Sequence, residues 1–116
     1  MKNLKLFNKS ELVEMERLKS LDPELKRFLV NLGSEQRSSL KWDLLGYLLT
    51  LKPKACAGAP IESVKLMLLF WKYDLLESDE GLGTLIEICK ALDPGKTAEI
   101  LEKNGLHELA ERMKGG

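Results

Sequence analysis

Six consecutive large apolar residues, Leu66 to Trp71, stand inside the segment "KLMLLFWKYDLL" (65–76). Successive residues of an α-helix are rotated by about 100°, so six of them in a row cover its whole circumference. Such a helix is either surrounded by other helices or leaves part of its apolar surface for a partner. The segment therefore predicts a central bundle helix. Its aromatic residues Phe70, Trp71 and Tyr73 are candidates for an exposed protein-binding patch.

The rest of the chain carries dense helix signals and almost no strand signals. Leu25, Phe28, Leu29 and Leu32 recur at the i, i+3, i+4, i+7 spacing of a buried helix face. The sequence predicts an all-α fold: a compact bundle of six to seven short antiparallel helices forming a single domain over residues 1–116. The expected helices cover about 9–19, 23–32, 35–51, 60–76, 82–92, 94–103 and 105–113.

Local signals place the ends of these helices. Asn8 with Glu11 resembles a capping box, and the Asp-Pro pairs at 22–23 and 93–94 are typical helix starts. Gly33 is expected to end the second helix, and Asn104-Gly105 to end the sixth. Residues 52–60 are predicted to form a loop, and 77–81 an acidic turn.

The helix over 35–51 has an unusually wide apolar stripe. Leu40, Leu44, Tyr47, Leu48 and Leu51 form one face of this helix. Further apolar residues widen that face, and they are Trp42, Leu45 and Leu49. A stripe of this breadth predicts contacts on two sides of the helix.

Composition excludes several classes of protein. With two cysteines, one histidine and no Cys-x-x-Cys spacing, the chain is not expected to hold a metal or a cofactor. It lacks the features of a secretory signal, and no apolar run approaches the roughly 18 residues of a membrane span. A net charge of zero argues against nucleic-acid binding. We therefore expect a reduced, cytoplasmic protein.

No residue pattern predicts an active site. His107 is the only imidazole in the sequence, and "HEL" around it is typical of an exposed helix surface. The triplet Gly95-Lys96-Thr97 resembles the end of a phosphate-binding loop, but the upstream glycine and the preceding strand of that motif are missing. The sequence therefore predicts that the protein is not an enzyme.

Charge is divided unevenly along the chain. Residues 1–54 contain 11 Lys/Arg and 7 Asp/Glu, whereas residues 55–116 contain 7 and 11. The two halves thus carry balances of +4 and −4. If this division survives folding, the molecule has a basic and an acidic side, which would suit head-to-tail association.

Several segments are similar to the death-fold superfamily, which comprises the death, death-effector, caspase-recruitment and pyrin domains. "AEILEKNGLHELAERM" (98–113) resembles its last two helices, where Glu108-Leu109-Ala110-Glu111 and Met113 match a pattern R-x-D-L-A-E-x-L. The arginine position of that pattern is Leu106 here. "LVEMERLKSLDPELKRFLVNL" (12–32) is similar to the first two helices of pyrin domains. "LKWDLLGYLL" (40–49) and "YDLLESDEGLGTLIEICKAL" (73–92) are similar to helices of death-effector domains.

This resemblance implies a homotypic adaptor or recruitment module that binds other proteins, including copies of itself, through charged helical faces. The implied basic face contains Lys26, Arg27, Arg37 and Lys41. The implied acidic face contains Asp79, Glu80, Glu99, Glu102 and Glu108. Two other functions fit the sequence: a helical effector or inhibitor that binds a different protein through an apolar patch, and a bundle that binds a small ligand or lipid.

Overall fold

The computed structural model describes residues 9–18, 23–51 and 61–115, and within these ranges every regular element is an α-helix. The all-α prediction is confirmed. The helices are α2 (Lys9–Leu18), α3 (Pro23–Leu29), α4 (Ser34–Thr50), α6 (Ile61–Lys72), α7 (Asp79–Leu92), α8 (Pro94–Lys103) and α9 (His107–Gly115). The predicted capping residues Asn8 and Asp22 and the loop 52–60 lie outside the described residues.

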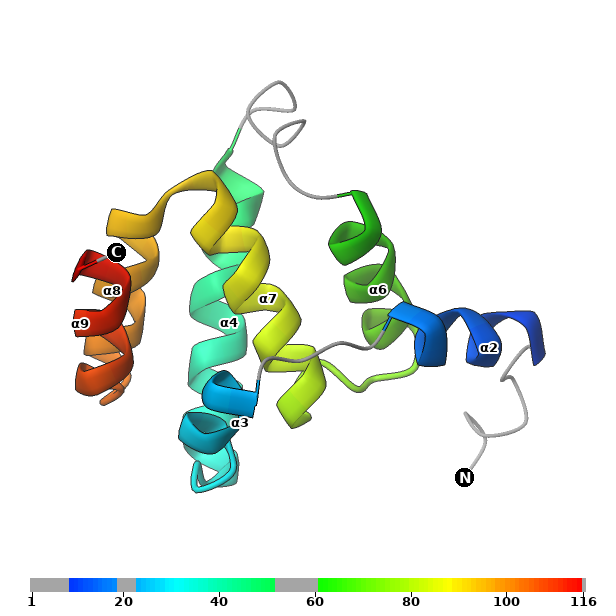
Figure 1. The fold of residues 1–116 in the computed structure, drawn as a ribbon, viewed down its shortest axis with the longest axis horizontal. Coiled ribbons are helices and arrows are strands. Elements are labelled where there is room, and N and C mark those ends of the chain that lie inside the picture. The colour runs from blue at the N-terminus through cyan, green and yellow to red at the C-terminus, as the bar shows by residue number, and fades with distance from the viewer. Residues whose placement is uncertain (1–8, 19–22, 52–60, 116) are drawn as a thin grey trace.

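Helix α7 forms the centre of the bundle. It packs against α3, α4, α6 and α8, while α9 packs mainly on α8 (Figure 1). The consecutive helices α6, α7, α8 and α9 alternate in direction (Figure 1). Helix α2 lies at the edge of the molecule and packs on α6. The α7 segment 81–86 is buried without interruption, as expected for a helix that is enclosed on most sides.

The core is built from leucines on the inner faces of these helices. Leu29 of α3, Leu40 and Leu44 of α4, and Leu82 and Leu85 of α7 have no exposed surface. Each buried side chain of this size stabilises the fold by about 1.5–3 kcal/mol relative to its exposure in water. The face predicted from the periodicity of 25–32 is therefore real, although α3 itself ends at Leu29.

Two predicted helix ends are confirmed by local geometry. The side chain of Asp93 accepts a hydrogen bond from the backbone N–H of Lys96 at 3.1 Å, with Pro94 at the start of α8. Gly105 has φ 86°, a left-handed conformation that glycine adopts at low cost. The chain therefore turns between α8 and α9 where Asn104-Gly105 predicts it.

Other predicted ends are wrong. Gly33 does not end a helix; it is the extended N-cap residue of α4, with φ −77°. The predicted helix 60–76 ends at Lys72, and Asp74 turns the chain with φ 60°. The predicted acidic turn is short, because the Ser78 side chain accepts a hydrogen bond from the N–H of Gly81 and starts α7 at Asp79.

Candidate protein-binding groove

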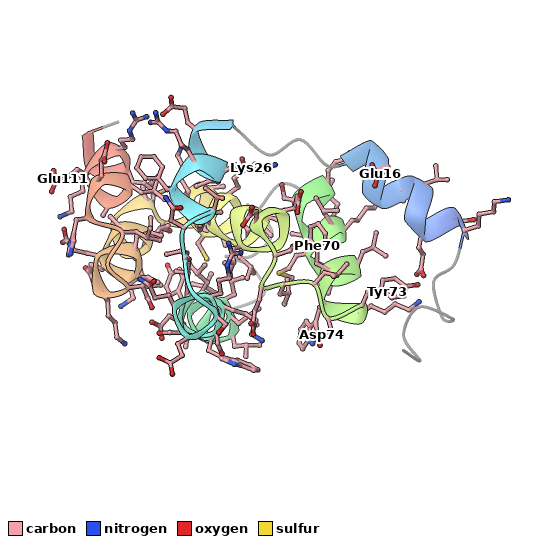
Figure 2. All side chains as sticks on the ribbon, turned by 90° about the horizontal axis from the view of Figure 1, so that it is seen from below. Glu16, Lys26, Phe70, Tyr73, Asp74 and Glu111 are labelled. Atoms are coloured by element: carbon pink, nitrogen blue, oxygen red, sulfur yellow. The ribbon has the colours of Figure 1, made fainter. Side chains whose placement is uncertain are left out.

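The surface of the apolar α6 segment is divided between the core and the exterior. Leu66 and Phe70 are buried, whereas Leu68 and Trp71 are 52% and 55% exposed. Tyr73, just after the helix, is buried. Figure 2 shows Phe70 on the side of α6 that faces α7 and Asp74 at the outer edge of the molecule. The expectation of an exposed aromatic residue is confirmed for Trp71 and wrong for Phe70 and Tyr73, whose positions face the core.

An apolar groove with a volume of about 310 Å³ lies between α4 and α6, with α7 as its floor. Every described residue that lines it is apolar: Trp42, Leu45, Leu48, Leu49, Val64, Met67, Trp71, Ile88 and Leu92. The groove therefore exists because α4 and α6 both pack on α7 but diverge from each other (Figure 1).

The two walls of the groove have the same spacing along their helices. Trp42, Leu45 and Leu49 of α4 stand at i, i+3 and i+7, and so do Val64, Met67 and Trp71 of α6. At 1.5 Å per residue, each wall is about 10 Å long. The two helices run in opposite directions (Figure 1), which brings Trp42 and Trp71 to the same end.

A smaller hollow of about 130 Å³ continues the groove at this tryptophan end. It shares Trp42, Leu45 and Trp71 with the groove and adds Lys41 and Asp74. The Lys41 ammonium lies 4.7 Å from the centroid of the Trp42 ring and 2.7 Å from a carboxylate oxygen of Glu77. The Lys41 ammonium therefore lies over the face of the Trp42 ring, whose side chain is 61% exposed.

Sequence reasoning did not identify Trp42 or Leu49 as site residues. Leu49 is 78% exposed although it is large and apolar. The signal that could have found both was the wide stripe of α4. The stripe predicts contacts on two sides of α4; this helix packs on α7 and α8, while Trp42 and Leu49 stay exposed on the face that lines the groove.

Four of the charged residues predicted to face a neighbouring molecule form contacts inside this one. The Arg37 guanidinium lies 2.6 Å from Asp79 and also donates to the carbonyls of Leu29, Leu32 and Glu77. Lys41 pairs with Glu77, and only 13% of the Lys41 side chain is exposed. Glu102 pairs with Lys114 on α9 at 3.4 Å, and the His107 ring lies 3.8 Å from its carboxylate. Arg37, Lys41 and Asp79 are therefore already paired within the molecule, and their place on intermolecular faces stays a prediction.

The remaining predicted charges lie on the surface. Arg27 pairs with Glu24 at 3.3 Å, and Glu99 pairs with Lys96 at 3.7 Å. Lys26 and Glu108 are exposed, and Glu80 is partly buried at the start of α7. None of these last three forms an ion pair with another described residue.

Ion pairs cross between the two halves of the sequence in both directions. Arg37 and Lys41 in the basic half pair with acidic residues of the other half, whereas Arg112–Glu24, Lys103–Asp43 and Lys72–Glu11 join the halves in the opposite sense. Folding therefore mixes the two charge balances instead of keeping them on separate sides.

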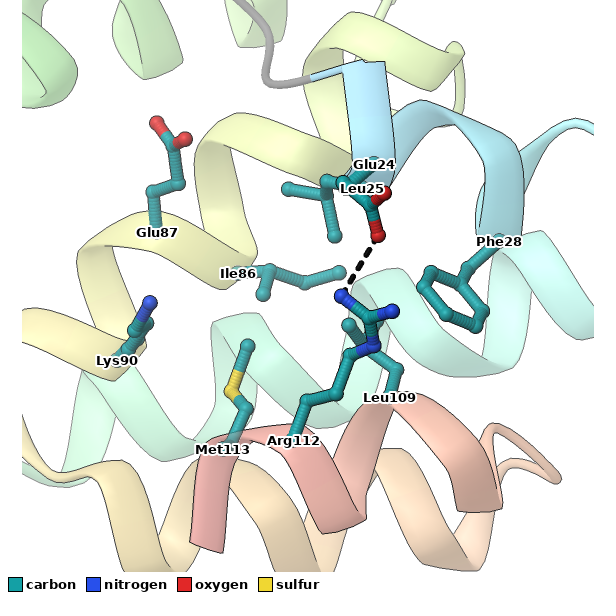
Figure 3. Close-up of a pocket in the computed structure, with 9 residues that line it drawn as sticks. All are labelled: Glu24, Leu25, Phe28, Ile86, Glu87, Lys90, Leu109, Arg112 and Met113. Carbon is teal, nitrogen blue, oxygen red and sulfur yellow. Dashed lines mark ion pairs between the residues drawn. The ribbon is translucent and has the colours of Figure 1, made fainter. Parts of the chain in front are cut away.

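A second cavity, of about 140 Å³, lies between α3, α7 and α9 (Figure 3). Arg112 spans it, 2.6 Å from a carboxylate oxygen of Glu24 and 5.5 Å from the centroid of the Phe28 ring. Its side chains thus hold α9 against α3 (Figure 3). Because Arg112 and Glu24 in this cavity pair with each other, we interpret it as a packing contact between α3 and α9 and not as a binding site.

A third, open hollow lies between α2 and α6 and has a volume of about 580 Å³. Glu11 of α2 accepts hydrogen bonds from the Lys72 ammonium at 2.9 Å and from the Tyr73 hydroxyl. The Tyr73 bond, followed by the Lys72 bond, lowers the pKa of Glu11. These contacts attach α2 to the bundle.

Cys89 and the Gly95-Lys96-Thr97 triplet, which could carry chemistry, both contribute to the packing or capping of helices. Cys89 carries a free thiol that is buried against the Leu44 carbonyl, and burial raises its pKa to about 12. The Gly95-Lys96-Thr97 triplet forms the first turn of α8, whose amides are capped by Asp93. Among the described residues no cluster of His, Cys, Asp and Glu could hold a metal ion, and no helix is long and apolar enough to cross a membrane.

Comparison of the chain with protein-family models, curated proteins and solved structures finds no match.

Proposed function

We propose that this chain is a protein-interaction module that binds an apolar segment of a partner protein in the groove between α4 and α6. The supporting observation is the groove itself, with nine apolar lining residues and two half-exposed tryptophans at one end. Tryptophans are frequent anchors of protein interfaces, because they bury a large area and lose little rotamer entropy.

Large apolar side chains that stay in contact with water raise the free energy of the protein unless a partner covers them. Leu49, Trp42 and Trp71 are all more than half exposed and line one continuous hollow. Covering them would recover about 25 cal/mol for each Å² of apolar surface removed from water. Contiguous apolar patches of this kind mark sites of interaction on soluble proteins.

The lining favours a protein segment over a small metabolite. Metabolite sites combine an apolar wall with a few polar groups that orient the ligand. Among the described residues, the walls and floor of this groove offer no polar side-chain group other than the indole N–H of Trp42 and Trp71. A lipid chain is the strongest small-ligand alternative, since an acyl chain needs no polar partner.

Homotypic assembly of the death-fold type stays a second prediction. Lys26 and Glu108 support it, because both are exposed and their charges are not neutralised by another described residue. The extensive pairing of Arg37, Lys41 and Asp79 within the molecule makes it the weaker proposal. The absence of catalytic activity and the cytoplasmic location also remain predictions; the free Cys89 thiol supports the second of these.

Selection of linear peptides from a displayed random library, with the full chain as bait, tests the proposal. We expect the selected peptides to lose binding to the Leu49→Glu variant and to keep it with Leu68→Glu. Both residues are exposed leucines, but Leu68 lies outside the groove. Peptides that bind both variants equally would contradict the proposal.

Light scattering at low and high salt tests the homotypic alternative. Self-association at low salt that is lost in a Lys26→Glu, Arg27→Glu double variant would favour assembly through charged faces. A monomer at both salt concentrations agrees with the groove as the interaction site.

A further inference from the structure

We infer that the segment bound in the groove is an amphipathic α-helix whose basic end lies beside Asp74. This inference rests on the proposed function and specifies the partner of the same site. Such a helix would carry an apolar stripe at i, i+3 or i+4, and i+7, with an arginine or lysine one turn beyond the stripe at its basic end.

The apolar lining determines the secondary structure of the occupant. An extended segment needs hydrogen-bond partners for its backbone N–H and C=O groups, and buried backbone groups without partners are costly. Apart from the indole N–H donors of Trp42 and Trp71, the nine lining residues provide no polar side-chain group and no acceptor, and their own backbone groups lie within helices α4, α6 and α7. A helix satisfies its backbone internally, so it can enter the groove without this cost.

The spacing of the walls fits the same occupant. Both walls present apolar residues at i, i+3 and i+7 over about 10 Å, which is two turns of an α-helix. Ridges with this spacing pack into the grooves of another helix. On the floor, Ile88 and Leu92 add one further turn of contact from α7. A bound helix would thus lie along the mouth of the groove and insert its apolar side chains between α4 and α6.

Charge distinguishes the two ends of the groove. At the tryptophan end, Lys41 is neutralised by Glu77, whereas the exposed Asp74 forms no ion pair with another described residue. The carboxylate of Asp74 leaves this end with one uncompensated negative charge. A basic residue of the partner placed there would form a charge-assisted hydrogen bond, which also fixes the direction of the bound helix.

The chain supplies its own reporter for the test, because its two tryptophans both line the groove. The probe is a tryptophan-free peptide of about 16 residues, based on alanine and glutamine, which is long enough to form a marginal helix. It carries leucines at i, i+3, i+4 and i+7 and an arginine one turn before them. Matched controls have the same composition with the leucines distributed around the helix, or a central proline.

We expect saturable binding of the striped peptide, with a blue shift of the tryptophan emission as Trp42 and Trp71 lose water. The scattered-leucine and proline peptides should bind at least about tenfold more weakly, a difference of roughly 1.4 kcal/mol. Trp71→Ala should weaken binding by a similar factor, measured by calorimetry, while Leu68→Ala should leave it within about twofold. Asp74→Asn keeps a residue that tolerates positive φ and removes the charge.

A double-mutant cycle between Asp74→Asn and replacement of the peptide arginine by glutamine tests the basic end. Non-additive losses support the assigned direction, whereas additive losses would overturn it. If library-selected peptides occupy the groove but the proline peptide binds as well as its parent, the inference of a helix fails while the proposed function stands. If no peptide binds and a medium-chain fatty acid produces the blue shift, the proposed function itself fails.

Discussion

Gly81 lies where the first turn of α7 passes against the chain that precedes it. A Cβ atom added there would lie 2.3 Å from the Leu75 carbonyl oxygen and 2.7 Å from the Cα of Leu76. Both neighbours are backbone atoms, so they cannot move aside by a change of rotamer. Gly46 is its counterpart in α4, where an added Cβ would meet no atom within 4 Å.

We expect Gly81→Ala to lower the free energy of unfolding by about 1–3 kcal/mol, because the added methyl group forces the α6–α7 connection away from α7. Gly46→Ala should instead raise it by about 0.5–1 kcal/mol, since alanine has the higher helix propensity. Urea unfolding of both variants checks the pair. A stabilised Gly81→Ala variant would show that the close approach does not exist in solution.

Asp93 joins two helices through its side chain. It accepts the backbone N–H of Lys96 and the hydroxyl of Tyr47 at 3.0 Å, and these bonds, the backbone bond first, lower the pKa of its carboxyl group. The folded-state pKa is therefore below the unfolded value near 3.8. The stability that Asp93 contributes is present above this unfolded value and is lost as the pH falls through the folded pKa.

Asp93→Asn should remove this part of the acid sensitivity, because asparagine can still cap α8 but carries no charge. We expect the variant to be less stable than the parent at neutral pH and the difference to shrink as the pH falls below about 4. Thermal unfolding measured across this pH range tests it. A difference that is constant with pH would contradict the assigned role of the charge.

At the scale of the elements, Arg37 connects three segments of the bundle. From α4, its guanidinium reaches the carbonyls of Leu29, the last residue of α3, and of Leu32 beyond it. It also reaches the Glu77 carbonyl before α7 and the Asp79 carboxylate at the start of α7. It thereby pairs carbonyl groups at and just beyond the end of α3, in the region where a glycine stop was expected.

Replacing Arg37 by alanine should lower the free energy of unfolding by about 1.5–3 kcal/mol, because several partly buried groups lose a charged partner. Arg37→Lys should not restore it, since an ammonium cannot reproduce the forked geometry. The matched control is Arg27→Ala, whose exposed pair with Glu24 should contribute less than about 0.5 kcal/mol. Equal effects at the two positions in urea unfolding would exclude this role for Arg37.

Helix α2 is attached to the bundle mainly through α6. The Tyr73 hydroxyl and the Lys72 ammonium both donate to Glu11, and they lower its pKa below 4.5. This stabilising contact is present above the unfolded pKa and is lost as the pH falls through the lowered folded value.

We expect Glu11→Gln to accelerate amide hydrogen exchange in α2 while exchange in α4 and α7 stays unchanged, since elements with few contacts open independently of the core. Hydrogen-exchange mass spectrometry at neutral pH measures both. Faster exchange in α7 as well would show that α2 and the core open together.

For the molecule as a whole, the sequence predicts those features of the fold that depend on residues close together along the chain. The helix faces, the Asp93-Pro94 start and the Asn104-Gly105 turn follow from local spacing and backbone chemistry. The Ser78 cap was missed because the acidic residues around it suggested a longer turn. Local patterns therefore predict that every regular element in the described chain is a helix, but they place some of the helix ends incorrectly.

The site depends on contacts that no local pattern records. Arg37 and Asp79 are 42 positions apart, so their pairing emerges only when α4 packs on α7. Trp42 and Trp71 likewise come together through the crossing of two helices over a third. Within the apolar segment 66–71, Leu66 and Phe70 are buried while Leu68 and Trp71 are exposed, and this division could not be assigned before the position of α7 was known.

The buried thiol of Cys89 makes the separation of α7 from α4 chemically measurable. Only the thiolate reacts with alkylating reagents, and a thiol with a pKa of about 12 that faces the Leu44 backbone is protected while these helices stay packed. In a Cys56→Ser variant, the rate of alkylation would therefore measure how often α7 separates from α4. A partner bound in the groove over α7 should lower the alkylation rate of Cys89. The Cys89 sulfur would then show whether binding at the surface stabilises the packing of α7 on α4.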